Sequence, residues 1–92
     1  MSTIVAMMKN KGIAEVFSQI ADLLEIMGEQ PFRVNSYRRA SRTLETLTQD
    51  VAELAAAKTL TALQGIGKST AAKIEEYLTT GSVSLHSELQ ES

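Results

Sequence analysis

The feature that most constrains the fold is a glycine pair between two apolar patterns, in the segment LTALQGIGKSTAAKI at residues 60–74. Leu60 and Leu63 are three residues apart, which places both on one side of a short helix. Gly65 and Gly67 permit backbone angles that are costly for other residues and carry no side chain to obstruct a ligand. The segment therefore predicts two helices joined by a tight turn.

The whole spacing matches the pattern of a helix-hairpin-helix motif. The matching positions are Leu60, Leu63, Gly65, Ile66, Gly67, Ala71 and Ile74. We expect Ile66 to insert into the core between the two helices, and the small Ala71 to let the helices approach closely. The second helix is expected to begin at about Gly67, which leaves its first N–H groups free. Free N–H groups at the positive end of a helix bind anions.

The hairpin predicts contact with a nucleic acid backbone. We expect the backbone amides of residues 65–67 to face outward, with Lys68 adding a cation beside them. Contacts of this kind bind phosphates without reading the bases, so the predicted binding is independent of DNA sequence.

Gly67-Lys68-Ser69-Thr70 also resembles the end of a nucleotide-binding phosphate loop. That loop requires a glycine at position 62, where this chain has Ala62. It also follows a strand of an α/β sheet, and the sequence predicts none. The context therefore favours nucleic acid over a nucleotide.

Apolar spacing predicts helices along the rest of the chain. In the first, Ile13, Val16, Phe17, Ile20, Leu24 and Met27 form one stripe, with Asn10 as N-cap and Gly28 at the C-terminal end. The second opens at Pro31 and has the stripe Val34, Tyr37, Ala40, Leu44 and Leu47. Asp50 and Glu53 resemble a capping box that starts a short third helix ending at about Ala57. The fourth carries Ala71, Ile74 and Leu78 and ends at Gly81, and a short last helix covers Val83 to Leu89.

No segment alternates with the period of a strand. The predicted fold class is all-α, a compact domain of four to five helices. We divide the chain into an N-terminal extension at residues 1–9 and one helical DNA-binding domain at residues 10–92, with the helix-hairpin-helix at 60–74.

Charge is distributed unevenly although the net charge is only −2. Residues 31–44 contain Arg33, Arg38, Arg39 and Arg42 and no acid. Residues 54–74 contain Lys58, Lys68 and Lys73 and again no acid. Phosphates respond to such local fields, so the two blocks predict one basic patch if the fold joins them. Solvated helix faces are the alternative, and charge alone leaves both open.

Other classes of site and location are not indicated. There is no cysteine, and the single His86 does not make a zinc site, so we expect no metal site. The longest apolar run, residues 4–8, is far shorter than a membrane span. We therefore expect a cytoplasmic protein without membrane contact, associated with the nucleoid if the source is bacterial.

Two segments together resemble the N-terminal, eight-kilodalton, lyase-type domain of family X DNA polymerases. They are EVFSQIADLLEIMGEQPFRVNSYRRASRTLETL at residues 15–47 and LTALQGIGKSTAAKIEEYLTTG at residues 60–81. DNA polymerase beta is of this family, and the bacterial and archaeal members look closer. The resemblance covers about residues 10–86.

The resemblance implies a domain that binds the 5′-phosphorylated side of gapped or nicked DNA in base-excision-type repair. It also implies 5′-deoxyribose-phosphate lyase activity, in which Lys73 would form a Schiff base before β-elimination. An amine must be neutral to attack C1′, and nearby cations favour that form. The expected phosphate-binding residues are Gly65, Ile66, Gly67, Lys68, Ser69, Thr70, Arg33, Tyr37, Arg38 and Arg39.

The chain departs from the family pattern around this pocket. Phe32 replaces a histidine, Thr61 and Ser69 stand where lysine is common, and Ala72 replaces a glutamate. The pocket thus keeps its candidate nucleophile but has fewer cations and fewer acid–base groups around it. The resemblance implies no required cofactor, although a monovalent cation at the hairpin is compatible with it.

Several alternatives stay open. Lys73 is also explained by an ordinary phosphate contact, or by pairing with Glu76 on a solvated helix face. Glu15, Asp22, Glu25 and Glu29 offer an acidic face to a basic protein partner. The polymerase site of the family uses carboxylates of a later palm domain, which this chain lacks, so the chain is either part of a longer enzyme or a free-standing module. The oligomeric state is not indicated.

Overall fold

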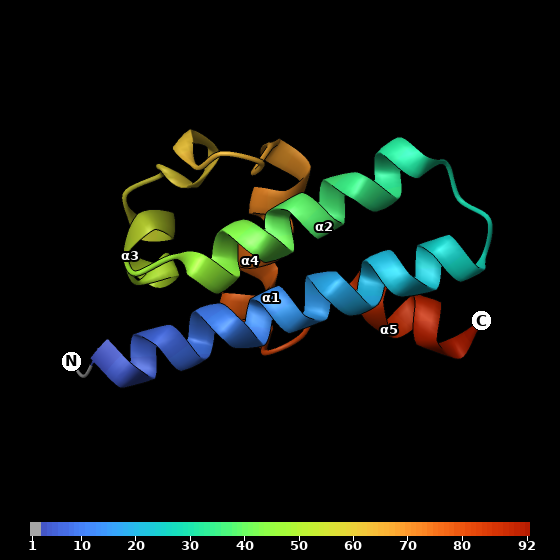
Figure 1. Ribbon diagram of the computed structural model, residues 1–92. Helices are drawn as coiled ribbons and strands as arrows, with labels where there is room; N and C mark the ends of the chain where they lie inside the picture. The colour runs from blue at the N-terminus through green and yellow to red at the C-terminus, as the bar shows by residue number, and fades with distance from the viewer. Residues whose placement is uncertain (1–2) are drawn as a thin grey trace.

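The computed structural model describes residues 3–92, with side chains from Met8 onward, and contains helices and no strand over that range (Figure 1). The predicted all-α fold with a helical hairpin is confirmed. The elements are α1 (Thr3–Ile26), α2 (Pro31–Thr46), α3 (Val51–Ala56), the 3₁₀ turn η1 (Leu60–Ala62), α4 (Lys68–Thr80) and α5 (Ser84–Glu91).

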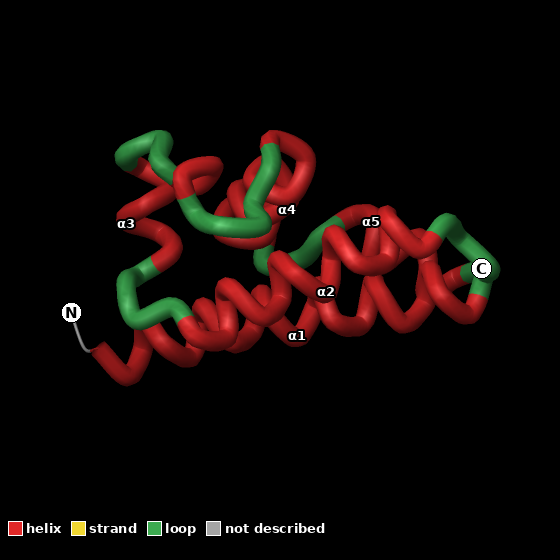
Figure 2. Tube along the Cα trace, turned by 45° about the horizontal axis from the view of Figure 1, so that its top comes forward, coloured by secondary structure: helices red, strands yellow, loops and turns green. Residues whose placement is uncertain are grey.

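The long helices α1 and α2 run antiparallel and form the framework of the domain (Figures 1 and 2). Their facing stripes are buried as the apolar spacing predicts. The buried residues of these two helices include Ile13, Phe17, Ile20, Leu24, Val34, Tyr37, Ala40 and Leu44. Small residues let the helices approach closely, and the buried Ser41 hydroxyl donates to the Ala14 carbonyl at 2.6 Å. Met27, which the spacing places on the stripe, lies beyond the end of α1 and is exposed.

The start of the first helix differs from the prediction. α1 begins at Thr3, so Asn10 lies inside the helix and is not its N-cap. The Asn10 side chain is buried, donates to the Gln49 carbonyl at 2.6 Å and accepts from the Val51 N–H at 3.1 Å. An asparagine side chain can cap a helix, and it can equally well bond to buried backbone groups of another segment. Here Asn10 does the second and joins α1 to the start of α3. The division at residues 9 and 10 stays a prediction, since the side chains of residues 1–7 lie outside the described part.

Helix ends follow the predicted signals. Gly28 and Gly81 have φ of +79° and +83°, as is typical just past a helix end. Asp50 caps α3 by accepting from the Ala52 N–H at 2.9 Å, whereas the Glu53 bond that would complete the predicted capping box is not formed among the described residues. Lys58, after α3, is the non-glycine residue with a positive φ, +61°, in the described part of the chain. For a residue with a side chain this conformation costs about 1–2 kcal/mol.

The short elements place the hairpin against the framework. α3, η1 and α4 form a small layer (Figure 2). Ile66 of the hairpin is buried as predicted. α5 packs on α1, where the His86 Nε2 lies 2.7 Å from the Gln19 Oε1. Among the described helices, none combines the length and the apolar character needed to cross a membrane.

Candidate nucleic-acid interface

Glycine suits the two positions of the hairpin for different structural reasons. Gly65 has a φ of +83°, and a Cβ atom there would lie 2.7 Å from Arg39 Cγ. Only glycine fits that position without rearrangement. Gly67 has an ordinary extended backbone, with φ of −93° and ψ of −174°, and a Cβ there would meet no atom within 4 Å. The expectation of unusual backbone angles is therefore confirmed for Gly65 and wrong for Gly67, whose bare backbone instead leaves the surface open.

Two of the three amides expected to be free, at residues 65–67, are already bonded. The Ile66 N–H donates to the Leu63 carbonyl at 3.1 Å, and the Gly67 N–H donates to the Thr70 hydroxyl at 2.9 Å. The prediction that these two amides face outward is therefore wrong, because the 3₁₀ turn and the Thr70 side chain satisfy them.

The first turn of α4 supplies the unpaired donors instead. Within the described chain, the backbone N–H groups of Lys68, Ser69 and Thr70 have no hydrogen-bond partner, and the first helical bond is made by the Ala71 N–H. Gly67 is the N-cap of this helix. Unpaired N–H groups at the positive end of a helix form a site suited to an anion.

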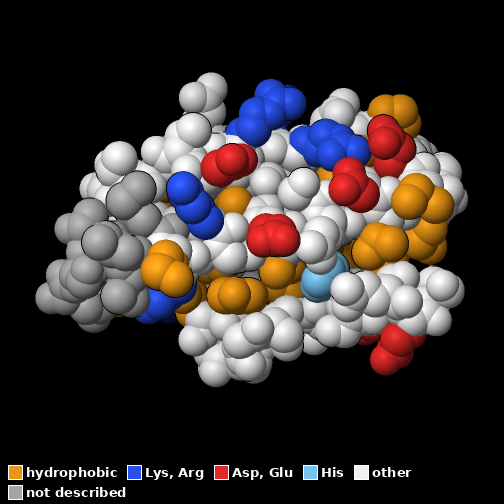
Figure 3. Space-filling model, turned by 60° about the horizontal axis from the view of Figure 1, so that its bottom comes forward, with side chains coloured by type: hydrophobic (Ala, Val, Ile, Leu, Met, Phe, Trp, Pro, Cys, Tyr) orange, Lys and Arg blue, Asp and Glu red, His pale blue; other side chains and the backbone are white. Residues whose placement is uncertain are grey.

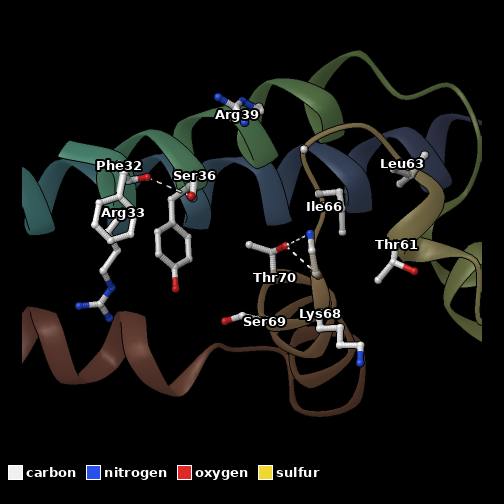
Figure 4. Close-up of a pocket in the computed structure, with 13 residues that line it drawn as sticks. Phe32, Arg33, Ser36, Arg39, Thr61, Leu63, Ile66, Lys68, Ser69 and Thr70 are labelled. Atoms are coloured by element: carbon white, nitrogen blue, oxygen red, sulfur yellow. Dashed lines mark hydrogen bonds between the residues drawn. The ribbon is translucent and has the colours of Figure 1, made fainter. Parts of the chain in front are cut away.

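These amides border an open groove of about 600 Å³ between α2 and the hairpin (Figure 4). One wall comes from α2, with Phe32, Arg33, Ser36, Tyr37 and Arg39. The other comes from η1, the turn and the start of α4, with Thr61, Leu63, Gly65, Ile66, Gly67, Lys68, Ser69 and Thr70. The lining contains three cationic side chains and no carboxylate.

The fold thus joins parts of the two basic blocks. Arg33 and Arg39 come from the first block and Lys68 from the second. Arg33 is also bound to Glu29 at 3.1 Å, whereas Arg39 and Lys68 form no ion pair within the described residues. Arg39 and Lys68 are therefore the side chains whose charge is available to an anion.

Arg38 is the predicted phosphate-binding residue that the structure does not bring to the groove. Its guanidinium binds Asp22 at 3.0 Å and Glu25 at 3.2 Å, both on α1. Consecutive residues of a helix point about 100° apart, so Arg38 and Arg39 face different neighbours. Acidic and basic side chains are interspersed on the face shown in Figure 3, in contrast to the groove.

The candidate nucleophile Lys73 lies beside the groove without lining it. Its Nζ donates to the Ser69 Oγ at 3.0 Å and lies 5.9 Å from the centroid of the Tyr37 ring, within range of a cation–π interaction. Ser69 and Tyr37 both line the groove, so the amine lies next to two of its lining residues. Tyr37 is itself fixed in the core by an edge-to-face contact with Phe17, at a centroid distance of 5.9 Å.

The alternative partner of Lys73 is occupied elsewhere. The Glu76 carboxylate accepts from the backbone N–H of Ser84 at 3.1 Å and from the Ser84 hydroxyl, at the start of α5. Among the described residues, no ion pair joins Lys73 to Glu76. Glu76 therefore binds the start of α5, and Lys73 has no carboxylate partner among the described residues.

Five residues that build the groove are not among the expected phosphate-binding residues. Ser36 and Leu63 line it, as do Phe32 and Thr61, which the resemblance marks only as departures from the family. Thr43 positions the hairpin, since its hydroxyl donates to the Gln64 carbonyl at 2.7 Å. Ser36 lies three residues from both Arg33 and Arg39, and that spacing was a usable signal; the role of Thr43 depends on a long-range contact that has no local signal.

Three of the four acidic residues that offer a face to a basic partner form ion pairs within the chain. Asp22 and Glu25 of α1 share Arg38, and Glu29, which follows α1, binds Arg33. In the described part of the chain no group of three or more His, Cys, Asp or Glu residues is placed to hold a metal ion. The monovalent cation at the hairpin stays a prediction.

Comparison with known proteins agrees with this geometry. The family model described as a helix-hairpin-helix domain matches residues 8–83. The chain is also 36% identical over 83 residues to the DNA polymerase/3′-5′ exonuclease PolX of Bacillus subtilis (strain 168). That match covers 90% of this chain and 14% of the Bacillus protein, so the chain spans about one seventh of its relative. The predicted resemblance to family X polymerases is confirmed.

Proposed function

Since the chain belongs to the family of helix-hairpin-helix domains, we propose that it binds DNA through the groove between α2 and the hairpin, without reading the base sequence. The observation that carries this proposal is the set of unpaired N–H groups at Lys68, Ser69 and Thr70, which open toward a groove without carboxylates. Amides and cations bind phosphate oxygens and ignore base edges.

The finer proposal is that the groove holds a 5′-phosphate at the downstream side of a gap or nick in DNA. A terminal phosphate carries more negative charge than an internal phosphodiester, and it suits a site that combines Arg39 and Lys68 with several N–H donors. The similarity to a DNA polymerase supports a polymerase-related role, and we propose that this role lies in repair of the base-excision type. Further polymerase domains in a longer chain are part of this proposal.

The test compares two versions of the same gapped duplex, one with a 5′-phosphate at the downstream end and one with a 5′-hydroxyl. We expect the phosphorylated duplex to bind more tightly, and the logarithm of its affinity to fall linearly with the logarithm of the salt concentration. An acidic polypeptide of equal charge serves as the control for binding by charge alone. Equal binding of the phosphorylated duplex and the acidic polypeptide at low salt would contradict the proposal.

We further propose that the domain acts as a 5′-deoxyribose-phosphate lyase with Lys73 as nucleophile. The neutral amine adds to C1′ of the ring-opened sugar, and loss of water gives an imine. Release of a C2′ proton to water then expels the 3′-phosphate by β-elimination. The position of Lys73 supports this step, since the groove residues Ser69 and Tyr37 hold its amine at the edge of the phosphate site. Without this step the domain remains a DNA-binding module.

A further inference from the structure

A second cavity, of about 220 Å³, adjoins the groove on the side of α3. Lys58 and Lys68 both line it, together with Thr61 and apolar residues, and Glu75 is the acid in its lining. Thr61 and Lys68 also line the larger groove, so the two spaces share one border. Lys58 lines only the second cavity, beyond this shared border.

The backbone of Lys58 sets this residue apart. Its φ of +61° belongs to the left-handed region, where glycine is usual just after a helix. The Lys58 N–H donates to the Ala55 carbonyl at 3.1 Å and the Thr59 N–H to the Leu54 carbonyl at 3.0 Å, the pattern of a helix end that glycine normally closes. A strained conformation that persists with a long cationic side chain points to a function for that side chain.

The charge of Lys58 is also unused within the domain. Neither Lys58 nor Lys68 forms a side-chain hydrogen bond or an ion pair with any described residue, and Glu75 in the same cavity is not paired with either. Thr61 and Ser69, which line the groove, carry no charge. Lys58 and Lys68 place cations on the other side of Thr61 instead.

We propose that Lys58 and Lys68 form a second phosphate subsite, which binds the phosphodiester next to the terminal phosphate in the same DNA strand. This inference rests on the proposed DNA binding and extends it from one phosphate to two. The shared border at Thr61 and Lys68 makes consecutive phosphates of one strand the fitting occupants. Lys68 serves both phosphates, and Lys58 serves the second alone.

The test uses Lys58→Gly, because glycine relieves the backbone strain while removing the charge. Lys58→Arg keeps the charge in the same backbone, and Lys11→Gln removes an exposed lysine of α1 that lines neither space. Each protein is titrated with 5′-phosphorylated gapped DNA, and with the same DNA carrying a neutral methylphosphonate in place of the next phosphodiester. Thermal unfolding is measured in parallel.

We expect Lys58→Gly to melt at the same or a higher temperature and to bind the natural DNA about five- to tenfold more weakly at 0.1 M salt, the effect of one lost phosphate contact. The methylphosphonate should weaken binding by the wild type, by Lys58→Arg and by Lys11→Gln, and have a clearly smaller effect on Lys58→Gly, in which Lys68 alone remains at the second phosphate. A wild type that binds both DNAs equally, or a methylphosphonate effect of undiminished size in Lys58→Gly, would overturn the second subsite and leave DNA binding intact. A wild type that binds neither DNA would instead refute the proposed function.

Discussion

The side chain of Arg39 packs so closely against the hairpin that a Cβ atom at Gly65 would lie 2.7 Å from Arg39 Cγ. Gly65→Ala should therefore destabilise the domain by about 2–4 kcal/mol, from the positive φ and the overlap together. Gly67→Ala adds the same methyl group where no atom lies within 4 Å, and should cost at most about 1 kcal/mol. Urea unfolding of both variants measures the difference.

The same pair of variants separates stability from binding. The methyl group of Gly67→Ala lies where a phosphate must approach the amides of α4, so this folded variant should lose affinity for 5′-phosphorylated gapped DNA by about tenfold or more. Undiminished binding by Gly67→Ala would show that the phosphate approaches from elsewhere.

Asn10 should be one of the most sensitive positions for stability. Asn10→Ala leaves the Val51 N–H and the Gln49 carbonyl without their partner inside the domain, which should cost about 2–3 kcal/mol. Asn35→Ala, at an exposed position of α2, should change stability by less than about 0.5 kcal/mol. Chemical denaturation with both variants measures this, and comparable effects would mean that water replaces the buried bridge.

Arg38 and Arg39 should differ in DNA binding although they are neighbours in the sequence. Arg39→Ala should reduce the slope of log affinity against log salt by about 0.9, because one phosphate contact is lost. Arg38→Ala should leave that slope unchanged and lower stability by about 0.2–1 kcal/mol through its ion pairs with Asp22 and Glu25. A salt titration for each variant gives the slopes. Equal slopes in the two variants would refute the assignment of Arg39 to the groove.

The lyase proposal has a covalent readout. Wild-type protein, mixed with a duplex that carries a 5′-deoxyribose-phosphate end and with borohydride, should give a stable adduct, and Lys73→Ala should give none. Lys68→Ala, on the same helix, should still give the adduct but only at higher protein concentration, because it lacks a phosphate contact. Denaturing gel electrophoresis reports the adduct, and an adduct in Lys73→Ala would exclude this lysine as the nucleophile.

The spacing of apolar residues and glycines predicts much of this fold, because helix faces and helix ends are decided by residues that are close in the sequence. The stripe of α2, the glycines that end α1 and α4, and the burial of Ile66 follow from residue type and period alone. The start of α1 does not, because a polar residue at position 10 fits a helix cap as well as a buried contact to Gln49 and Val51.

The sequence predicts most of the residues that line the candidate site, but not which arginine reaches the groove or which amides stay unpaired. Arg38 and Arg39 are identical in type, and only the packing of α2 between α1 and the hairpin decides which one reaches the groove. The amides that stay free depend on the rotamer of Thr70, whose hydroxyl accepts the Gly67 N–H. Neither choice is expressed in residue spacing.

The aromatic contact between Phe17 and Tyr37 has a consequence for how this domain can vary. The Tyr37 ring contacts Phe17 of α1 on its buried side, and the Lys73 amine lies over the ring. Phe17, Tyr37 and Lys73 therefore form one row from the core to the surface. Any remodelling of the interior at Phe17 shifts the surface on which that amine rests. A change to the core at Phe17 is therefore also a change to the surroundings of the candidate nucleophile Lys73.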